Sequence, residues 1–296
     1  MSRFRQHRQL LVQSPVNPHS ALQGPNWARK IETHRNEHPG ISDGSDNVRA
    51  MNLVLLEPAD FLNGDHVRLH GRRARYVKEI HRATIGRELR VGVINGKIGF
   101  GRVLQIDENA LELTVHLESD PLPPLPLHLI LALPRPKVLN RTIAAAVSMG
   151  IKQIDLINAW RVEKAYWGSP RLSQENLRLQ SILGLEQAGD STLPIIRLHK
   201  LFGRFVREES LDLAGKLAVL AHPGTEATAP SSVTKPVVLA IGPEGGFIDR
   251  EVNTFRDIGF TELNLGPRIL RVETALAFLV GRLSDRFQRP EDSIRS

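Results

Sequence analysis

Three loops in the C-terminal quarter of the 296-residue chain carry residue types suited to holding a flat ligand. Glycine and proline in such loops let backbone amide and carbonyl groups approach a ligand closely, so that the edge of an adenine ring can be recognised without side chains. Each loop alone could be an ordinary tight turn, but the three together favour a nucleotide-like pocket. They read Ala221-His222-Pro223-Gly224, Gly242-Pro243-Glu244-Gly245-Gly246 and Leu265-Gly266-Pro267-Arg268-Ile269-Leu270-Arg271-Val272-Glu273-Thr274-Ala275.

Other kinds of site are excluded by motifs that the sequence lacks. No Gly-x-Gly-x-x-Gly opens the C-terminal half and no Gly-x-x-x-x-Gly-Lys-[Ser/Thr] occurs, so a dinucleotide fold and a P-loop are unsupported. There is no His-Glu-x-x-His, and the histidines after residue 50 are scattered, so we expect no metal site. The absence of cysteine excludes disulfides, thiolate nucleophiles and enzymes that add a thiolate to a pyrimidine base.

The three loops follow apolar runs typical of strands, and the region before them alternates such runs with helical patterns. Strands are predicted at 127–133, 151–157, 195–198, 217–220, 237–241 and 262–265, and helices at 138–149, 173–188, 249–258 and 272–287. This order predicts an α/β domain with a mostly parallel sheet. Ligands of such sheets bind beyond the carboxyl ends of the strands, which is where the three loops lie in the sequence.

Residues 51–120 show a different pattern, in which short alternating apolar and polar runs are separated by glycine and asparagine. Asn95-Gly96 indicates a hairpin, because a type I′ turn needs two positive φ angles. We therefore predict a small antiparallel β-barrel. A helical segment at 72–82 interrupts it, and its basic residues form either a solvated helix face or a surface that contacts RNA phosphates: Arg72, Arg73, Arg75, Lys78 and Arg82.

Residues 121–126 are predicted to be a stiff linker, since residues 120–126 hold four prolines. The C-terminal domain is then expected to span 127–289, with a tail at 290–296. Residues 1–50 have no apolar period and are interpreted as a disordered extension. The extension is a true tail, a transit-like segment or the product of a start codon assigned upstream of Met51. Its His34 and His38 are assigned to a solvated tail rather than to a metal pair.

The net charge of +7 and the pI near 10.0 make a polyanionic partner worth testing. Residues 1–50 contain seven basic and four acidic residues and thus carry +3 of that charge. Local basic clusters are therefore better indicators of RNA binding than the total. No apolar run approaches the roughly 18 residues of a membrane helix, and nothing near Met1 reads as a secretory signal. We expect a soluble, cytoplasmic protein, or an organellar one if residues 1–50 are a transit peptide.

The second and third loops together resemble the signature of the bacterial 16S ribosomal RNA uridine-N3 methyltransferases of the SPOUT superfamily. The resemblance covers about Met51 to Phe287. It implies a PUA-like barrel, a short linker and a SPOUT domain tied in a deep trefoil knot. It also implies a homodimer whose substrate is a uridine in the decoding region of the small-subunit RNA.

S-adenosylmethionine is the cofactor that this resemblance implies, bent within the knot and held largely by backbone groups. No metal and no membrane partner are expected. The implied cofactor-binding residues are His222, Ile241, Gly242, Glu244, Gly245, Gly246, Leu265, Gly266, Ile269 and Leu270.

Arg271 and Glu273 are our candidates for catalysis under the same resemblance. Uridine N3 carries a proton and is a poor nucleophile until that proton leaves. The site must therefore favour the N3 anion, through a cation near O2 or O4, or remove the proton during attack, through a carboxylate or a water. The alternative is that the two residues form an ion pair. Glu244 either neutralises the sulfonium or fixes its own loop, and we favour the second.

A second group of basic residues lies near the expected mouth of the pocket, and any one of them could be an ordinary surface residue. Trp160 and Trp167 flank this group and could stack on bases, although packing in the core or a dimer interface is favoured. The proposed RNA contacts here are Arg135, Lys137, Arg161 and Lys164, in addition to Arg72, Arg73, Arg75 and Arg82.

The chain departs from the family pattern at two places. Asp190 stands where we expect an arginine, and Leu133-Pro134-Arg135-Pro136-Lys137 replaces a Lys-Glu stretch. The departures leave the cofactor loops intact. They keep open a SPOUT methyltransferase with another RNA target, and a non-catalytic RNA-binding factor in ribosome assembly remains the alternative of a different class.

Overall fold

The structure is a computed structural model that describes residues 52–80, 82–208, 211–223 and 233–284. All described residues belong to one compact unit. The predicted extension at 1–50, the histidine pair within it, the end of the predicted C-terminal domain and the tail at 290–296 lie outside the described residues.

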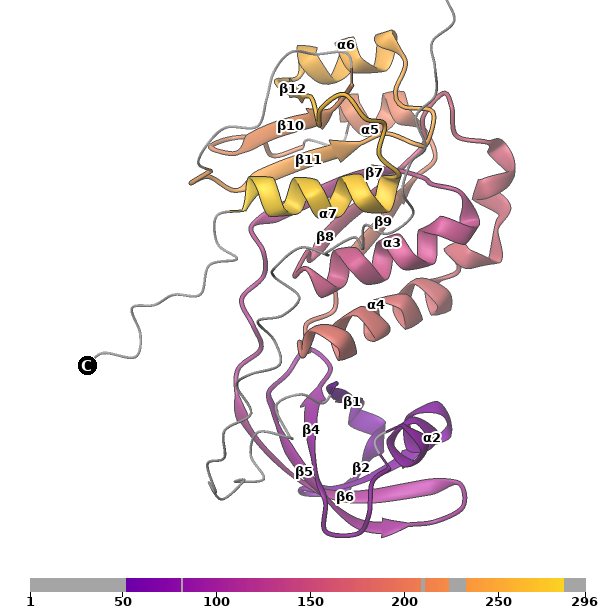
Figure 1. The fold of residues 1–296 in the computed structure, drawn as a ribbon, viewed down its shortest axis with the longest axis vertical. Coiled ribbons are helices and arrows are strands. Elements are labelled where there is room, and N and C mark those ends of the chain that lie inside the picture. The colour runs from indigo at the N-terminus through magenta and orange to yellow at the C-terminus, as the bar shows by residue number, and fades with distance from the viewer. Residues whose placement is uncertain (1–51, 81, 209–210, 224–232, 285–296) are drawn as a thin grey trace, which may run out of the picture. The chain divides into compact units, whose positions relative to one another are not determined.

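The N-terminal part forms a six-stranded sheet in the order β1-β4-β5-β6-β3-β2 (Figure 1). Its pairs are antiparallel except β1–β4, which is parallel, so the prediction of a purely antiparallel arrangement was wrong at this pair. The chain between β1 and β4 is long enough for the crossover that a parallel pair needs. The strands are β1 (Val54–Leu56), β2 (Phe61–Asn63), β3 (His66–His70), β4 (Glu88–Val93), β5 (Ile98–Ile106) and β6 (Ala110–Ser119).

Asn95 lies in the predicted hairpin between β4 and β5, but the turn differs from the predicted type. Four residues separate the two strands, and Asn95 has a φ of 58°. The backbone N–H of Asn95 donates to Ser191 O at 2.8 Å, and its side-chain oxygen accepts from Leu193 N at 2.9 Å. The hairpin tip therefore contacts the C-terminal part of the chain.

Helix α2 (Gly71–Glu79) confirms the helical segment predicted inside this sheet. It buries Ala74 and Val77 against the apolar faces of the strands, and its other face carries the basic residues. A short 3-10 helix, η1 (Pro58–Asp60), precedes it and contains the buried Asp60.

The C-terminal part forms a second six-stranded sheet in the order β12-β10-β11-β7-β8-β9, with every pair parallel. The predicted α/β class with a mostly parallel sheet is confirmed. Strands β7 and β11 are buried along nearly their whole length, as expected for strands covered on both faces. The strands are β7 (Leu127–Ala132), β8 (Gln153–Ile157), β9 (Ile195–His199), β10 (Leu217–Ala221), β11 (Val237–Ile241) and β12 (Thr261–Leu263).

Three helices pack side by side on one face of this sheet: α3 (Pro136–Ser148), α4 (Gln174–Ala188) and α7 (Val272–Leu283) (Figure 1). The contact between α3 and α4 depends on Gly184, because a Cβ there would lie 2.5 Å from the carbonyl oxygen of Ala144. Helix α4 begins at Ser173, whose hydroxyl accepts from Asn176 N, and ends at Gly189 with a φ of 70°.

The remaining helices are α5 (Phe202–Glu208) and α6 (Asp249–Asp257), which share an aromatic cluster in which Phe202 contacts Phe255 with ring centroids 5.5 Å apart. Two 3-10 helices, η2 (Lys164–Gly168) and η3 (Pro170–Leu172), connect β8 to α4. The pattern did not predict α5, η2 or η3, which are too short for a clear period. Within the described residues, no helix has the length and apolar character needed to cross a membrane.

Candidate functional site

Strands β10, β11 and β12 are neighbours in the sheet, so the loops after their carboxyl ends converge. They enclose a pocket, and all ten predicted cofactor-binding residues lie on its wall, although which molecule they bind is still a prediction. Gly224, the last residue of the first loop, lies outside the described residues. The pocket is lined by Ala221, His222, Pro223, Ile241, Gly242, Pro243, Glu244, Gly245, Gly246, Asn264, Leu265, Gly266, Arg268, Ile269, Leu270, Val272 and Ala275.

The glycines of the Gly242–Gly246 loop are required by its geometry. A Cβ on Gly242 would lie 3.1 Å from the backbone N of Phe247, and Gly246 has a φ of 74° that other residues rarely adopt. A Cβ on Gly245 would lie 3.0 Å from Cδ of Arg161. The loop is thus both a tight turn and part of the pocket wall. The two interpretations that the sequence left open for this loop therefore do not exclude each other.

Two contacts from distant segments hold this loop. The Arg161 guanidinium donates to the carbonyl oxygen of Gly245, and the backbone N–H of Arg135 donates to Glu244 Oε1 at 3.0 Å. Glu244 therefore fixes its own loop, which supports the role that we favoured for it. Arg161, by contrast, is engaged by the pocket wall, so its predicted role as an RNA phosphate contact gains no support from its position.

His222 presents a buried polar atom to this region. Its backbone N–H donates to Leu263 O at 3.0 Å, and this bond continues the pairing of β10 with β12. Its side-chain Nδ1 is buried and has no hydrogen-bond partner within the described residues. Because an unsatisfied buried polar group costs free energy, this nitrogen is suited to a hydrogen bond with a bound molecule.

The two predicted catalytic residues are not on the pocket wall. Arg271 is the exposed N-cap of α7, while Glu273 lies 3.7 Å from Arg141 of α3 as an ion pair. Glu273 thus forms an ion pair, as our alternative suggested, but its partner is Arg141 and not Arg271. Arg268 lines the pocket instead, and our choice of catalytic residues missed it because the sequence does not show which residues of an irregular loop face inward.

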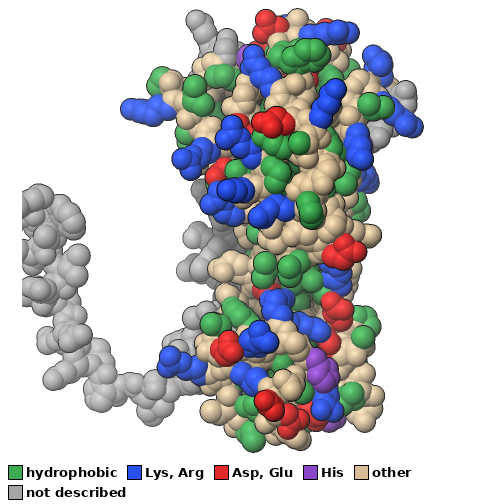
Figure 2. Space-filling view, turned by 90° about the vertical axis from the view of Figure 1, so that its right-hand side faces the viewer, with side chains coloured by type: hydrophobic (Ala, Val, Ile, Leu, Met, Phe, Trp, Pro, Cys, Tyr) green, Lys and Arg blue, Asp and Glu red, His purple; other side chains and the backbone are tan. Residues whose placement is uncertain are grey.

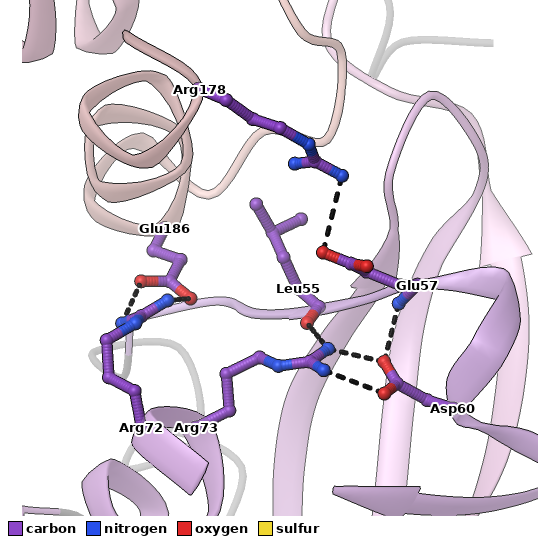
Figure 3. A network of polar contacts seen from close by, with 7 residues as sticks. All are labelled: Leu55, Glu57, Asp60, Arg72, Arg73, Arg178 and Glu186. Carbon is purple, nitrogen blue, oxygen red and sulfur yellow. Dashed lines mark hydrogen bonds and ion pairs between the residues drawn. The ribbon is translucent and has the colours of Figure 1, made fainter. Parts of the chain in front are cut away.

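The four arginines predicted in this helical segment, of which α2 contains the first three, divide into two groups, and Figure 3 shows the first group, Arg72 and Arg73. Arg72 forms a bidentate pair with the buried carboxylate of Glu186 on α4, at 3.1 and 3.2 Å. Arg73 binds the buried Asp60 with both nitrogens and also the carbonyl oxygen of Leu55. Arg75 and Arg82 are exposed. Arg72 and Arg73 therefore have a structural role. Of these four arginines, only Arg75 and Arg82 have the exposure expected of phosphate contacts.

Near the pocket, Arg135, Lys137 and Lys164 are exposed, as phosphate contacts must be. Figure 2 shows Lys and Arg side chains recurring over the C-terminal part of one face, with hydrophobic side chains between them and some acidic ones. On this face, the cations are thus separated by other side chains rather than joined in one continuous basic patch.

Asp190, the departure from the family pattern, is a buried structural residue. Its carboxylate lies 2.5 Å from Nζ of Lys152 and accepts from the backbone N–H groups of Ser191 and Thr192 at 2.6 and 3.1 Å. Lys152 is thus the basic partner of Asp190. Because residue 190 is buried, it does not contribute to the surface of the protein.

A second buried carboxylate, Asp155 of β8, accepts from His128 at 2.5 Å and from His199 at 2.8 Å. Burial raises the pKa of Asp155, but the hydrogen bonds from the two histidines outweigh burial and leave the pKa below its ordinary value. The cluster is not part of the pocket wall. Among the described residues, this cluster included, no group of three or more His, Cys, Asp or Glu side chains is arranged so that it could hold a metal ion.

Comparisons with known proteins agree on one family. A family model described as "RNA methyltransferase domain" matches residues 121–284. The ribosomal RNA small subunit methyltransferase E of Treponema pallidum is 31% identical over 76% of this chain and 87% of its own length. The protein of the same name from Mycobacterium tuberculosis is 28% identical, over 68% of this chain and 81% of its own.

Solved structures share the fold. A methyltransferase from Legionella pneumophila with bound SAM superposes with a TM-score of 0.64 and 23% identity, over 79% of this chain and 96% of its own. The ribosomal RNA small subunit methyltransferase E of Neisseria gonorrhoeae, bound to S-adenosyl methionine, superposes with a TM-score of 0.64 and 21% identity, over 78% of this chain and 95% of its own. The chain therefore belongs to the RNA methyltransferase family, as a SPOUT-type member related to ribosomal RNA small subunit methyltransferase E.

Proposed function

We propose that the protein transfers a methyl group from S-adenosylmethionine to N3 of a uridine in the decoding region of 16S ribosomal RNA. The observation that carries the proposal is the convergence of three loops, with all ten predicted residues, on one pocket at the carboxyl edge of the parallel sheet. Both solved structures described above hold this cofactor, which supports the same choice for this chain.

The pocket suits such a molecule because four glycines, Gly242, Gly245, Gly246 and Gly266, lie on its wall and leave the backbone accessible. The close turns at Gly242 and Gly246 leave amide and carbonyl groups able to face an adenine edge, and the unsatisfied His222 Nδ1 offers one further polar contact. When bound, the cofactor supplies an electrophilic methyl carbon on a sulfonium. The apolar residues Ile241, Leu265 and Leu270 exclude water from that region.

The chain's own part in catalysis is to make uridine N3 nucleophilic. Arg268, on the pocket wall, is placed to stabilise negative charge on the uridine oxygens as the N3 proton leaves. Arg271 and Glu273 stay our candidates for a second cation and for the base, acting from the N-terminal end of α7. For Glu273 to act as base, its contact with Arg141 must open when RNA binds.

The finer architecture is also part of the proposal. The N-terminal sheet is a PUA-like RNA-binding barrel at 51–120, residues 121–126 are the linker and residues 127–289 are the SPOUT domain with a deep trefoil knot. Two copies form a homodimer, since Ile269 on the pocket rim and Phe278 on α7 are 92% and 47% exposed and a second subunit would cover them. The protein acts in the cytoplasm, where ribosomes are assembled.

The alternative of a different RNA target is weakened by the structure of residue 190. Because Asp190 is buried against Lys152, its departure from the family pattern says nothing about the RNA surface. The stretch at Arg135 and Lys137 stays basic and exposed, which suits a phosphate backbone of any sequence.

The experiment that tests the function combines two measurements. Titration calorimetry of the full chain with S-adenosylmethionine should show saturable binding, and the absence of heat would favour the non-catalytic assembly factor. Nucleosides from small-subunit RNA of a deletion strain should lack N3-methyluridine, and restoring the wild-type gene should return it. Persistence of N3-methyluridine in a strain with no second enzyme for that base would overturn the substrate assignment.

A further inference from the structure

Trp160 is the most exposed aromatic residue of the described chain, with 79% of its side chain accessible. It lies in the loop that connects β8 to η2, at the same carboxyl edge of the sheet as the pocket. A single exposed apolar residue is common on protein surfaces, so exposure alone assigns nothing. The way in which its backbone is held makes this residue unusual.

Trp160 and the residue after it are fixed by helix α6 and by the Gly242–Gly246 loop that precedes this helix. The backbone N–H of Trp160 donates to Glu251 Oε1 at 2.8 Å, and Glu251 is a buried carboxylate whose other oxygen accepts from Ile248 N at 3.1 Å. The next side chain, Arg161, binds the carbonyl oxygen of Gly245 on the pocket wall. The indole is therefore carried by a rigid backbone, one residue away from a direct contact with the pocket.

Trp167 shows what a packed tryptophan looks like in the same segment. Its Nε1 donates to Asn158 Oδ1 at 2.9 Å, and its ring packs against the apolar core of the C-terminal sheet. The role in packing that the sequence suggested for both tryptophans thus applies to Trp167, whereas Trp160 presents its ring to solvent.

The charges around Trp160 favour a nucleic acid as its occupant. The exposed Lys164 begins η2, and the exposed Arg135 contacts the same pocket loop through Glu244, while the guanidinium of Arg161 is held by Gly245. An exposed aromatic ring among separate cations matches how proteins bind single-stranded RNA, with bases stacked on rings and phosphates near lysine and arginine. A rigid platform also loses little conformational entropy when a base stacks on it.

We propose that Trp160 is a stacking platform for an unpaired base of the RNA beside the uridine to be methylated. The inference rests on the proposed function and deepens it by naming a residue that touches substrate. An unpaired base next to the target matters because the target itself must leave its stack to reach a recessed pocket.

The test compares Trp160→Ala, Trp160→Phe and a matched control, Leu122→Ala, which shortens another exposed apolar side chain (54% accessible) away from the pocket. The substrate is small ribosomal subunits from a strain that lacks the enzyme. Base–aromatic stacking corresponds to a change of roughly 5- to 150-fold in affinity, so Trp160→Ala should raise KM for the subunits within that range. Trp160→Phe should restore most of the loss, and Leu122→Ala should behave as wild type.

Three results distinguish the explanations. The dissociation constant for S-adenosylmethionine should be the same in all variants, and a loss of cofactor affinity in Trp160→Ala would overturn the stacking role. A fall in the molar mass measured by light scattering would instead assign Trp160 to contact with a second copy of the chain. If the wild-type enzyme is active and KM is unchanged in Trp160→Ala, this inference is refuted and the proposed function is not affected. If the wild-type protein neither binds the cofactor nor methylates subunits, the proposed function itself is refuted.

Discussion

Arg161 shows how far a residue's role depends on its partner rather than on its charge. The sequence places it in a basic segment, and RNA contact was our prediction for it. In the structure, the Arg161 guanidinium donates a hydrogen bond to the carbonyl oxygen of Gly245, and the aliphatic part of the Arg161 side chain packs against that glycine. The role that follows is to position the pocket loop.

Arg161→Ala should therefore weaken S-adenosylmethionine binding about tenfold, since a hydrogen bond from a charged donor is worth about 1.5–3 kcal/mol and the loop can partly relax. Titration calorimetry measures this directly. Lys164→Ala, three residues further along the exposed segment, serves as the control and should keep wild-type affinity. An Arg161→Ala protein with unchanged cofactor affinity, but with an RNA affinity that has lost part of its salt dependence, would return Arg161 to the role of a phosphate contact.

Strands β7, β8 and β9 each contribute one residue to the cluster of the partly buried His128 with the buried Asp155 and His199. Since the pKa of Asp155 is lowered in the folded state, its ionised form stabilises the protein, and this contribution is complete above the unfolded value of 3.8. It is lost as the pH falls through the lower, folded-state pKa.

Asp155→Asn should thus lower the free energy of unfolding by about 2 kcal/mol at pH 7 through the loss of charged hydrogen bonds. The difference between wild type and variant should shrink once the pH drops below 3.8. Urea unfolding at a series of pH values measures both. Asp257→Asn, an exposed position on α6, is the control. A difference that stays constant down to the acid limit would show that the carboxylate's ionisation does not contribute.

Elements with a clear period could be predicted from the sequence, and those without one could not. Strand β11 matches its predicted bounds, and α4 and α7 begin within one residue of theirs, because apolar runs and caps define them locally. Helix α5 has only seven residues, too few for a helical period. The parallel pairing of β1 with β4 depends on contacts between segments far apart in the sequence, which a local pattern does not contain.

The site divides in the same way. The glycines and prolines of the three loops predicted the pocket wall, since their conformational freedom is a local property. The partner of Arg161 lies 84 residues away in the chain, and the Lys152–Asp190 pair spans 38, so neither could be predicted from spacing. That Arg268 rather than Arg271 faces the pocket is set by the course of an irregular loop.

Across the whole described chain, the polar contacts that join the N-terminal sheet to the C-terminal part include those of Asn95 with Ser191 and Leu193 at the hairpin tip and a second group around Glu186. Besides the Arg72–Glu186 pair, Leu53 N donates to Glu186 O at 3.0 Å, and Arg178 lies 3.3 Å from Glu57 (Figure 3). Glu186 is buried, whereas Arg72 is 42% exposed. The two partners should therefore respond differently to removal.

Arg72→Ala should lower the free energy of unfolding by about 2 kcal/mol, because it leaves a buried carboxylate unpaired and only part of the pair is screened by solvent. Glu186→Gln should cost less, since an exposed arginine can be hydrated, and the double variant should recover part of the loss. A double-mutant cycle in urea measures the coupling. Arg75→Ala, on the exposed side of the same helix, is the control, and equal effects of Arg72→Ala and Arg75→Ala would argue against the pair.

Gly184 allows the close approach of α4 to α3, and one additional methyl group at this position would increase the distance between the two helices. The backbone of α4 approaches Ala144 closely enough that a Cβ at 184 would meet its carbonyl oxygen at 2.5 Å. Two residues later the same helix carries Glu186, which holds Arg72. Alanine at 184 would thus move α4 away from α3 and carry Glu186 with it, so that a substitution in the interior of the C-terminal part would alter the contact through which α4 holds Arg72 of the N-terminal part.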